Sequence, residues 1–166
     1  MIRVVVADLA AVSVDAVVRP ANELLDPITP ATGKLDERAG ERFSSLRRVQ
    51  SPLDVGAAVV TGGGDLAAEF VLHVVIQSEE RAVERDTVRR ALVSAWQRAG
   101  DWQLGRVATP LVGASAGALT IEEAAALLAE TFRDRPAAPL YPAELQIVVE
   151  RADEVPVVEA VVGKAS

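Results

Sequence analysis

Cysteine is absent from this chain of 166 residues, and aromatic residues make up only 4 % of it. The absence of cysteine excludes disulfide bonds, thiolate metal sites and thiol catalysis, and it leaves the redox compartment open. Because hydrophobic residues make up 50 % of the chain, the core has to be built mainly from valine, leucine, isoleucine and alanine. Buried strands covered by alanine-rich helices have this composition, so the sequence predicts an α/β fold.

Long basic runs and long apolar runs are also missing. The net charge is -7 and the densest basic stretches are the pairs Arg47-Arg48 and Arg89-Arg90, so we expect no bulk nucleic-acid binding. No stretch reaches the roughly 18 apolar residues that span a bilayer. The apolar run at the N-terminus is too short for a signal peptide and is interrupted by Asp8. The length suits one domain, so we expect a single domain over residues 1–166, located in the cytoplasm and without a membrane partner.

Short β-branched runs alternate with helical patterns along the chain. Strands are expected at Ile2–Ala7, Asp15–Arg19, Ala57–Thr61, Phe70–Val75, Arg106–Val112 and Glu144–Glu150. Helices are expected from near Leu35 after a loop with Pro27, Pro30 and Gly33, over Glu84–Ala99 with Gly100 as its C-cap, after the capping box Thr120–Glu123, and around Pro156.

The segment Gly113-Ala114-Ser115-Ala116-Gly117 has the spacing Gly-x-Ser-x-Gly of a hydrolase nucleophile. An α/β-hydrolase triad needs a histidine after the serine, but the single histidine, His73, lies upstream. The alternative is a loop that binds an anion through its backbone, because side chains this small let peptide N–H groups reach a phosphate. We therefore favour an anion-binding loop, with a tight packing turn as the simpler interpretation.

Other motifs give weaker indications of function. "PATGKL" lacks the glycine of a P-loop, because Ile28 stands five positions before Gly33. "TGGGD" fits a phosphate cradle and a turn between strands about equally well. His73 is expected to be a core residue, because the chain lacks the His and Cys partners of a metal site. We expect no metal and no cofactor, although a magnesium site made only of carboxylates stays open.

Three blocks in series, "VVVADLAAVSVDAVVRPANELL", "GAAVVTGGGDLAAEFVLHVV" and "RVATPLVGASAGALTIEEAAALL", resemble the macro domain family in order and spacing. The resemblance extends from Ile2 to Val149 and implies a three-layer α/β/α sandwich with a central mixed sheet. It also implies a cleft for ADP-ribose or a similar nucleotide, free or attached to a protein, at the carboxyl ends of the strands. It implies nothing about the oligomeric state.

The resemblance assigns expected roles to individual residues. Asp8 matches the acid that accepts a hydrogen bond from the adenine amino group, with the backbone amide of Leu9 beside it. Asn22 matches the last residue of the Asn-x-Ala-Asn motif, which faces the distal ribose, and is the best catalytic candidate. Gly113, Ala114, Ser115, Ala116 and Gly117 match the loop that clasps the diphosphate, where glycine is more usual at the position of Ser115.

The chain departs from the family pattern around the distal ribose. Arg19, followed by Pro20, replaces the first asparagine of the motif, and "DPITPAT" replaces a glycine-rich loop. Thr32 stands where hydrolytic members tend to carry an acid, and a threonine cannot activate water as a carboxylate does. The end of "ELQIVVERAD" offers no aromatic side chain to stack on adenine.

Three functions follow as hypotheses. The first is binding of ADP-ribose or a related nucleotide diphosphate without efficient catalysis. The second is an ADP-ribosyl or O-acyl-ADP-ribose hydrolase that uses Asn22 with an acid such as Asp26 or Asp36. The third is a macro-like scaffold for protein contacts that binds no nucleotide. We prefer the first and then the second.

Overall fold

The computed structural model describes residues 1–114, 116–136 and 140–164. In these residues six strands form one sheet in the order β1-β6-β5-β2-β4-β3, and they are β1 (Ile2–Val6), β2 (Ala16–Asn22), β3 (Ala58–Gly62), β4 (Phe70–Gln77), β5 (Arg106–Thr109) and β6 (Glu144–Val149). Neighbouring strands are parallel except for β3, which runs antiparallel to β4. The carboxyl ends of five strands therefore meet at one edge of a mixed sheet.

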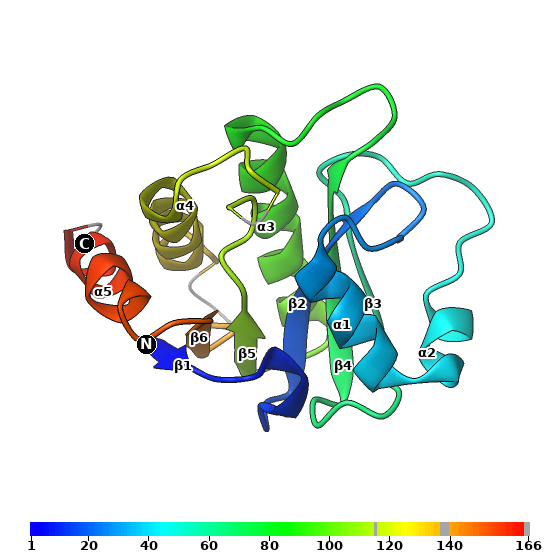
Figure 1. Ribbon diagram of the computed structural model, residues 1–166, viewed down its shortest axis with the longest axis horizontal. Coiled ribbons are helices and arrows are strands. Elements are labelled where there is room, and N and C mark those ends of the chain that lie inside the picture. Colours follow the sequence, from blue (N-terminus) through cyan, green and yellow to red (C-terminus); the bar gives the residue numbers. More distant parts are fainter. Residues whose placement is uncertain (115, 137–139, 165–166) are drawn as a thin grey trace.

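Helices cover both faces of this sheet (Figure 1). The described helices are η1 (Leu9–Ala11), α1 (Pro30–Ala39), α2 (Glu41–Leu46), α3 (Arg85–Asp101), α4 (Ile121–Arg133) and α5 (Glu154–Lys164). Helices α3, α4 and α5 lie on one face, and η1, α1 and α2 lie on the other. The predicted three-layer α/β/α sandwich is confirmed. No helix in the described part of the chain combines the length and the apolar character needed to cross a membrane.

Two cores follow from the alternation of side chains along the central strands. Val18 and Leu72 face α3 and α4, where Trp96 packs in a T-shaped arrangement against Phe132 with ring centroids 6.3 Å apart. Val17 and its neighbours face the opposite helix layer. Trp96 of α3 and Phe132 of α4 thus fill the space between these two helices.

Two helix boundaries differ from the sequence prediction. Helix α1 begins at Pro30, five residues before the expected start, because proline fits the first helical position, where its missing N–H has no intrahelical partner. The Thr29 hydroxyl caps this end by accepting a hydrogen bond from the Thr32 amide at 3.2 Å. Helix α3 continues through Gly100 to Asp101, so Gly100 is not its C-cap.

The predicted N-terminus of α4 is confirmed. The Thr120 hydroxyl accepts a hydrogen bond from the Glu123 amide at 3.1 Å, and the apolar face of the helix is buried against α3 and α5. Strand β5 ends at Thr109, so the chain turns into the loop before α4 three residues earlier than expected.

Candidate functional site

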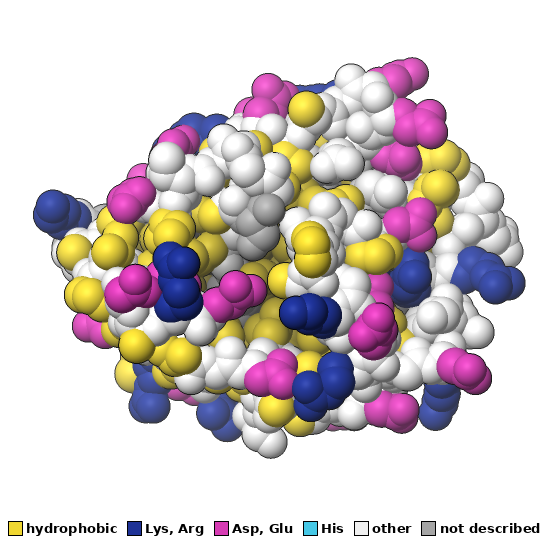
Figure 2. Space-filling view, viewed as in Figure 1, with side chains coloured by type: hydrophobic (Ala, Val, Ile, Leu, Met, Phe, Trp, Pro, Cys, Tyr) yellow, Lys and Arg dark blue, Asp and Glu magenta, His cyan; other side chains and the backbone are white. Residues whose placement is uncertain are grey.

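A cavity of about 670 Å³ lies at the carboxyl edge of the sheet, between the strand ends and α1. Its volume is within the range of roughly 300 to 1,000 Å³ that is usual for small-molecule sites. On the face shown in Figure 2, apolar side chains line the bottom of a hollow and charged side chains surround its rim. This position is where open α/β sheets generally bind ligands.

Charged side chains gather at the end of the cavity formed by β1 and β6. Asp8 and Leu9 follow β1, and Glu150 follows β6. The Asp8 carboxylate caps η1 through Oδ1, which accepts the Ala10 amide at 3.0 Å. Its Oδ2 accepts a hydrogen bond from Arg38 Nη1 of α1 at 2.8 Å. The structure therefore places Asp8 and Leu9 on the cavity, with Arg38 beside them.

The small-residue loop after β5 contributes Gly113 and Ala116 to the same cavity. Gly113 has a positive φ of 93°, and a Cβ on it would lie 2.8 Å from the Leu119 side chain, so the turn requires glycine. Among the described residues, no acceptor is found for the amides of Gly113 and Ala116. Both residues line the cavity, and amides for which the described residues offer no acceptor are suited to an anion.

The rest of the predicted loop lies differently. The amides of Ala114 and Gly117 donate to the carbonyls of Leu111 and Ala114 at 3.1 and 3.0 Å, so they hold the turn together. Ser115 lies outside the described residues. Ala116 and Gly117 also border a second, shallower hollow of about 540 Å³ beside the loop that starts at Gln77.

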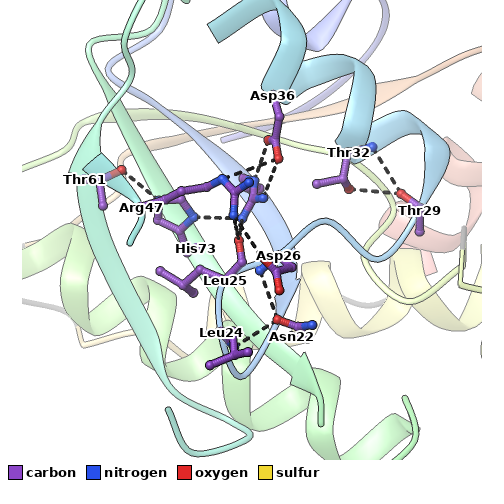
Figure 3. A network of polar contacts seen from close by, with 11 residues as sticks. Asn22, Leu24, Leu25, Asp26, Thr29, Thr32, Asp36, Arg47, Thr61 and His73 are labelled. Carbon is purple, nitrogen blue, oxygen red and sulfur yellow. Dashed lines mark hydrogen bonds and ion pairs between the residues drawn. The ribbon is translucent and has the colours of Figure 1, made fainter. Parts of the chain in front are cut away.

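Arg19, which replaces an asparagine of the family motif, is fully buried, and Figure 3 labels three of its partners, Asp36, Leu25 and His73. Its Nε and Nη2 donate to the two carboxylate oxygens of Asp36 at 2.7 and 2.6 Å. Its Nη1 donates to the Leu25 carbonyl at 2.8 Å and lies 3.2 Å from Nδ1 of His73. The protein therefore uses four of the five N–H donors of the guanidinium, and Arg19 is absent from the cavity lining.

His73 is held in one tautomer by its neighbours. The Thr61 hydroxyl donates to the Gly62 carbonyl at 3.0 Å, so Nε2–H of His73 donates to Thr61 at 2.8 Å. Nδ1 then accepts the bond from Arg19. Burial, followed by the charges of Arg19 and Arg47, places the pKa of His73 well below its ordinary value. The ring also stacks on Phe43 with centroids 5.8 Å apart.

The other residues expected at the distal ribose do not meet in the cavity. Oδ1 of Asn22 accepts the amides of Leu24 and Asp26 at 2.9 and 3.0 Å, and Asn22 is not among the lining residues. Asp26 pairs with Arg47 at 3.2 Å, and Asp36 pairs with Arg19. Both carboxylates lie outside the lining, whereas the Thr32 residue that replaces an acid does line the cavity.

Several lining residues were not predicted from the sequence, including Lys34, Arg38, Ile28 and Glu150. Lys34 and Arg38 are four positions apart and so share a face of α1, but this signal depends on knowing that the helix starts at Pro30. In the described residues no group of three or more His, Asp or Glu side chains is arranged to hold a metal ion.

This arrangement defines a class of protein, an α/β/α domain with a ligand cleft at the carboxyl ends of a mixed sheet. The sequence pattern of the macro domain family matches residues 18–128, and the chain belongs to that family. A protein of Aeropyrum pernix is 32 % identical over 126 residues, which cover 75 % of this chain and 67 % of the relative.

Two solved macrodomains share the fold. The Trypanosoma brucei macrodomain in complex with ADP-ribose superposes with a TM-score of 0.82 at 19 % identity, and the match covers 98 % of this chain and 69 % of the other. The Oceanobacillus iheyensis macrodomain with ADP gives a TM-score of 0.79 at 17 % identity, covering 97 % of this chain and 89 % of the other.

Proposed function

We propose that this macro domain binds ADP-ribose or a related nucleoside diphosphate in the cavity at the strand ends, without efficient catalysis. The observation that carries the proposal is the combination, in one cavity, of a carboxylate at Asp8 with the amides of Gly113 and Ala116, which have no acceptor in the described part of the chain. The solved relatives from Trypanosoma brucei and Oceanobacillus iheyensis hold ADP-ribose and ADP, respectively, which supports a ligand of this class.

The base is assigned to the charged end of the cavity. A carboxylate has about four lone-pair sites, and Asp8 uses one for the Ala10 amide and one for Arg38. It can still accept a bond from an exocyclic amino group. Arg38 offers a planar guanidinium beside it, which can stack on a base where the family's aromatic is missing.

The diphosphate is assigned to the loop after β5 and to the facing side of α1. The amides of Gly113 and Ala116 supply hydrogen-bond donors, and Lys34 adds a positive charge on the cavity wall. A local cation matters here because the whole chain has a net charge of -7 and repels anions at long range.

Binding without turnover is supported by the positions of the acids. Hydrolysis needs a carboxylate that can position or activate water at the scissile bond. The candidates Asp26 and Asp36 are paired with arginines away from the cavity, and Thr32 is neutral. We therefore propose that the protein binds the nucleotide without hydrolysing it.

Calorimetric titration with ADP-ribose, ADP and AMP tests the proposal. We expect micromolar dissociation constants for the first two nucleotides, about -8 kcal/mol. Ala116→Glu adds a negative charge to the cavity wall and should weaken binding of the diphosphates at least tenfold. Ala118→Glu is its matched control, since Ala118 is exposed in the same loop but does not line the main cavity.

A second pair of variants tests the base site. Asp8→Ala should weaken ADP binding, whereas Asp15→Ala should not, because Asp15 also accepts a backbone amide but lies away from the cavity. Absence of heat with every nucleotide would refute the proposal. Steady release of ADP-ribose from a modified protein, lost in Asn22→Ala, would show that hydrolysis is the function instead.

A further inference from the structure

The two ends of the main cavity differ in chemistry. Because the sheet order is β1-β6-β5-β2-β4, the residues that follow β1 and β6 mark one end and those of β2 and β4 mark the other. Helix α1 spans the distance between them. Its approach begins beside β2, where Pro27 bridges to Ala21, and its Arg38 reaches Asp8 at the β1 end. The charged side chains Asp8, Arg38 and Glu150 all belong to the β1 and β6 end.

The β2 and β4 end offers few hydrogen-bonding groups. Pro20 of β2 and Pro30 at the start of α1 line it, and proline has no backbone N–H. The hydroxyls of Thr29 and Thr32 are 3.0 Å apart and hydrogen-bond to each other, and the Thr32 amide is used by Thr29. The Thr32 amide and one of the two hydroxyl protons are thus occupied within the protein, which leaves the other hydroxyl proton and the Ala31 amide as donors at this end.

The polar side chains of β2 point elsewhere. Arg19 is directed to Asp36 beneath α1, and Asn22 closes its own turn, so β2 contributes only Pro20 to the lining. Ile28 and Ile76 complete an apolar surface at this end. A sugar with several hydroxyls placed there would lose hydrogen bonds to water that the few polar groups at this end replace only in part.

We propose that the cavity prefers a nucleoside diphosphate whose terminal phosphate carries an apolar ester group, alkyl or aryl, over one that carries a sugar. The inference rests on the proposed function, which assigns the base and the diphosphate, and it specifies the chemical group attached to the terminal phosphate. Each methylene that is buried at the apolar end should raise affinity roughly fourfold. Two buried methylenes therefore give on the order of tenfold.

Competitive calorimetry with ADP, ADP-ribose and the butyl ester of ADP on its β-phosphate tests this preference. We expect the butyl ester to bind about tenfold more tightly than ADP and more tightly than ADP-ribose, with a more negative heat-capacity change because apolar surface is buried. Ile28→Asn should reduce the advantage of the ester over ADP, both measured in the variant, to about threefold or less. Leu24→Asn is the matched control, because Leu24 is exposed in the same segment and lies outside the lining.

The outcomes separate the two proposals. Equal or tighter binding of ADP-ribose than of the butyl ester, with ADP bound, would overturn the preference alone. An advantage of the butyl ester that is the same in Ile28→Asn as in Leu24→Asn would also overturn it. No binding of ADP, ADP-ribose or the ester would overturn the proposed function, and the inference with it.

Discussion

The buried ion pair between Arg19 and Asp36 provides a sharp test of what holds α1 over the cavity. The two side chains form a bidentate pair at 2.6 and 2.7 Å, with Arg19 fully buried and Asp36 only 12 % exposed. Asp36→Asn keeps the shape of the side chain but removes its charge. The Arg19 guanidinium is then left buried without an anion, 5.7 Å from the Phe43 ring and near the second cation Arg47.

Removing one partner of a buried pair typically costs about 3 to 5 kcal/mol. We expect about 3 kcal/mol, because Asp36 keeps some exposure and Arg19 retains its bonds to Leu25 and His73. This cost is a substantial fraction of the unfolding free energy of a typical domain, which is roughly 5 to 15 kcal/mol. Urea unfolding followed by circular dichroism measures the change, with the slope of the transition as a check on two-state behaviour.

Arg38→Met supplies the matched control. Arg38 pairs with Asp8 at a similar distance of 2.8 Å, but the two side chains are 60 % and 53 % exposed. An exposed pair contributes about 0 to 1 kcal/mol, so this variant should be nearly neutral. If Asp36→Asn costs no more than Arg38→Met, burial does not strengthen the Arg19 pair and the reasoning fails.

Three further predictions concern His73, the α4 cap and the small-residue loop. Burial and then the charge of Arg19 lower the pKa of His73. Below about pH 6.5 the unfolded chain therefore binds a proton at His73 that the folded chain does not bind, and the unfolding free energy decreases as the pH is lowered. The urea midpoints at about pH 7.5 and 5.5 should differ less in His73→Gln than in the unchanged protein. Thr120→Ala removes the cap of α4 and should cost about 1 kcal/mol of unfolding free energy, whereas Thr120→Ser should cost little. Gly113→Ala should weaken nucleotide binding and lower the melting temperature, because its Cβ would meet Leu119 at 2.8 Å and its φ is positive; unchanged binding would contradict the role given to this turn.

Much of the fold could be predicted from local patterns. The β-branched run at Phe70–Val75 and the helical spacing from Glu84 each depend on neighbours within a few residues, and both elements are present. The early start of α1 differs from the prediction because a proline in sequence indicates a helix break as readily as a first helical position, and here Thr29 caps a helix that begins at Pro30.

The polar contacts of the site could not be predicted in the same way. Arg19 and Asp36 are 17 positions apart, and nothing in the spacing indicates that they share a buried pair. The role of Asn22 could not be predicted either, because an asparagine that closes a turn and one that binds a ribose look the same in sequence. The resemblance to the macro domain family indicates where the strands end, but the direction of each polar side chain there depends on tertiary packing.

The replacement at Arg19 links the stability of the fold to the chemistry of the cavity. Its guanidinium and that of Arg47 both donate to the Leu25 carbonyl, at 2.8 and 2.9 Å, and Leu25 has a positive φ of 61°. A leucine in that conformation is strained, so these two bonds help to hold the turn that leads into α1. Restoring a short polar residue at position 19 would therefore remove an anchor of α1 and leave Asp36 with Arg47 at 3.7 Å. The network beneath α1 therefore depends on Arg19, whose side chain is directed to Asp36, while its neighbour Pro20 lines the cavity.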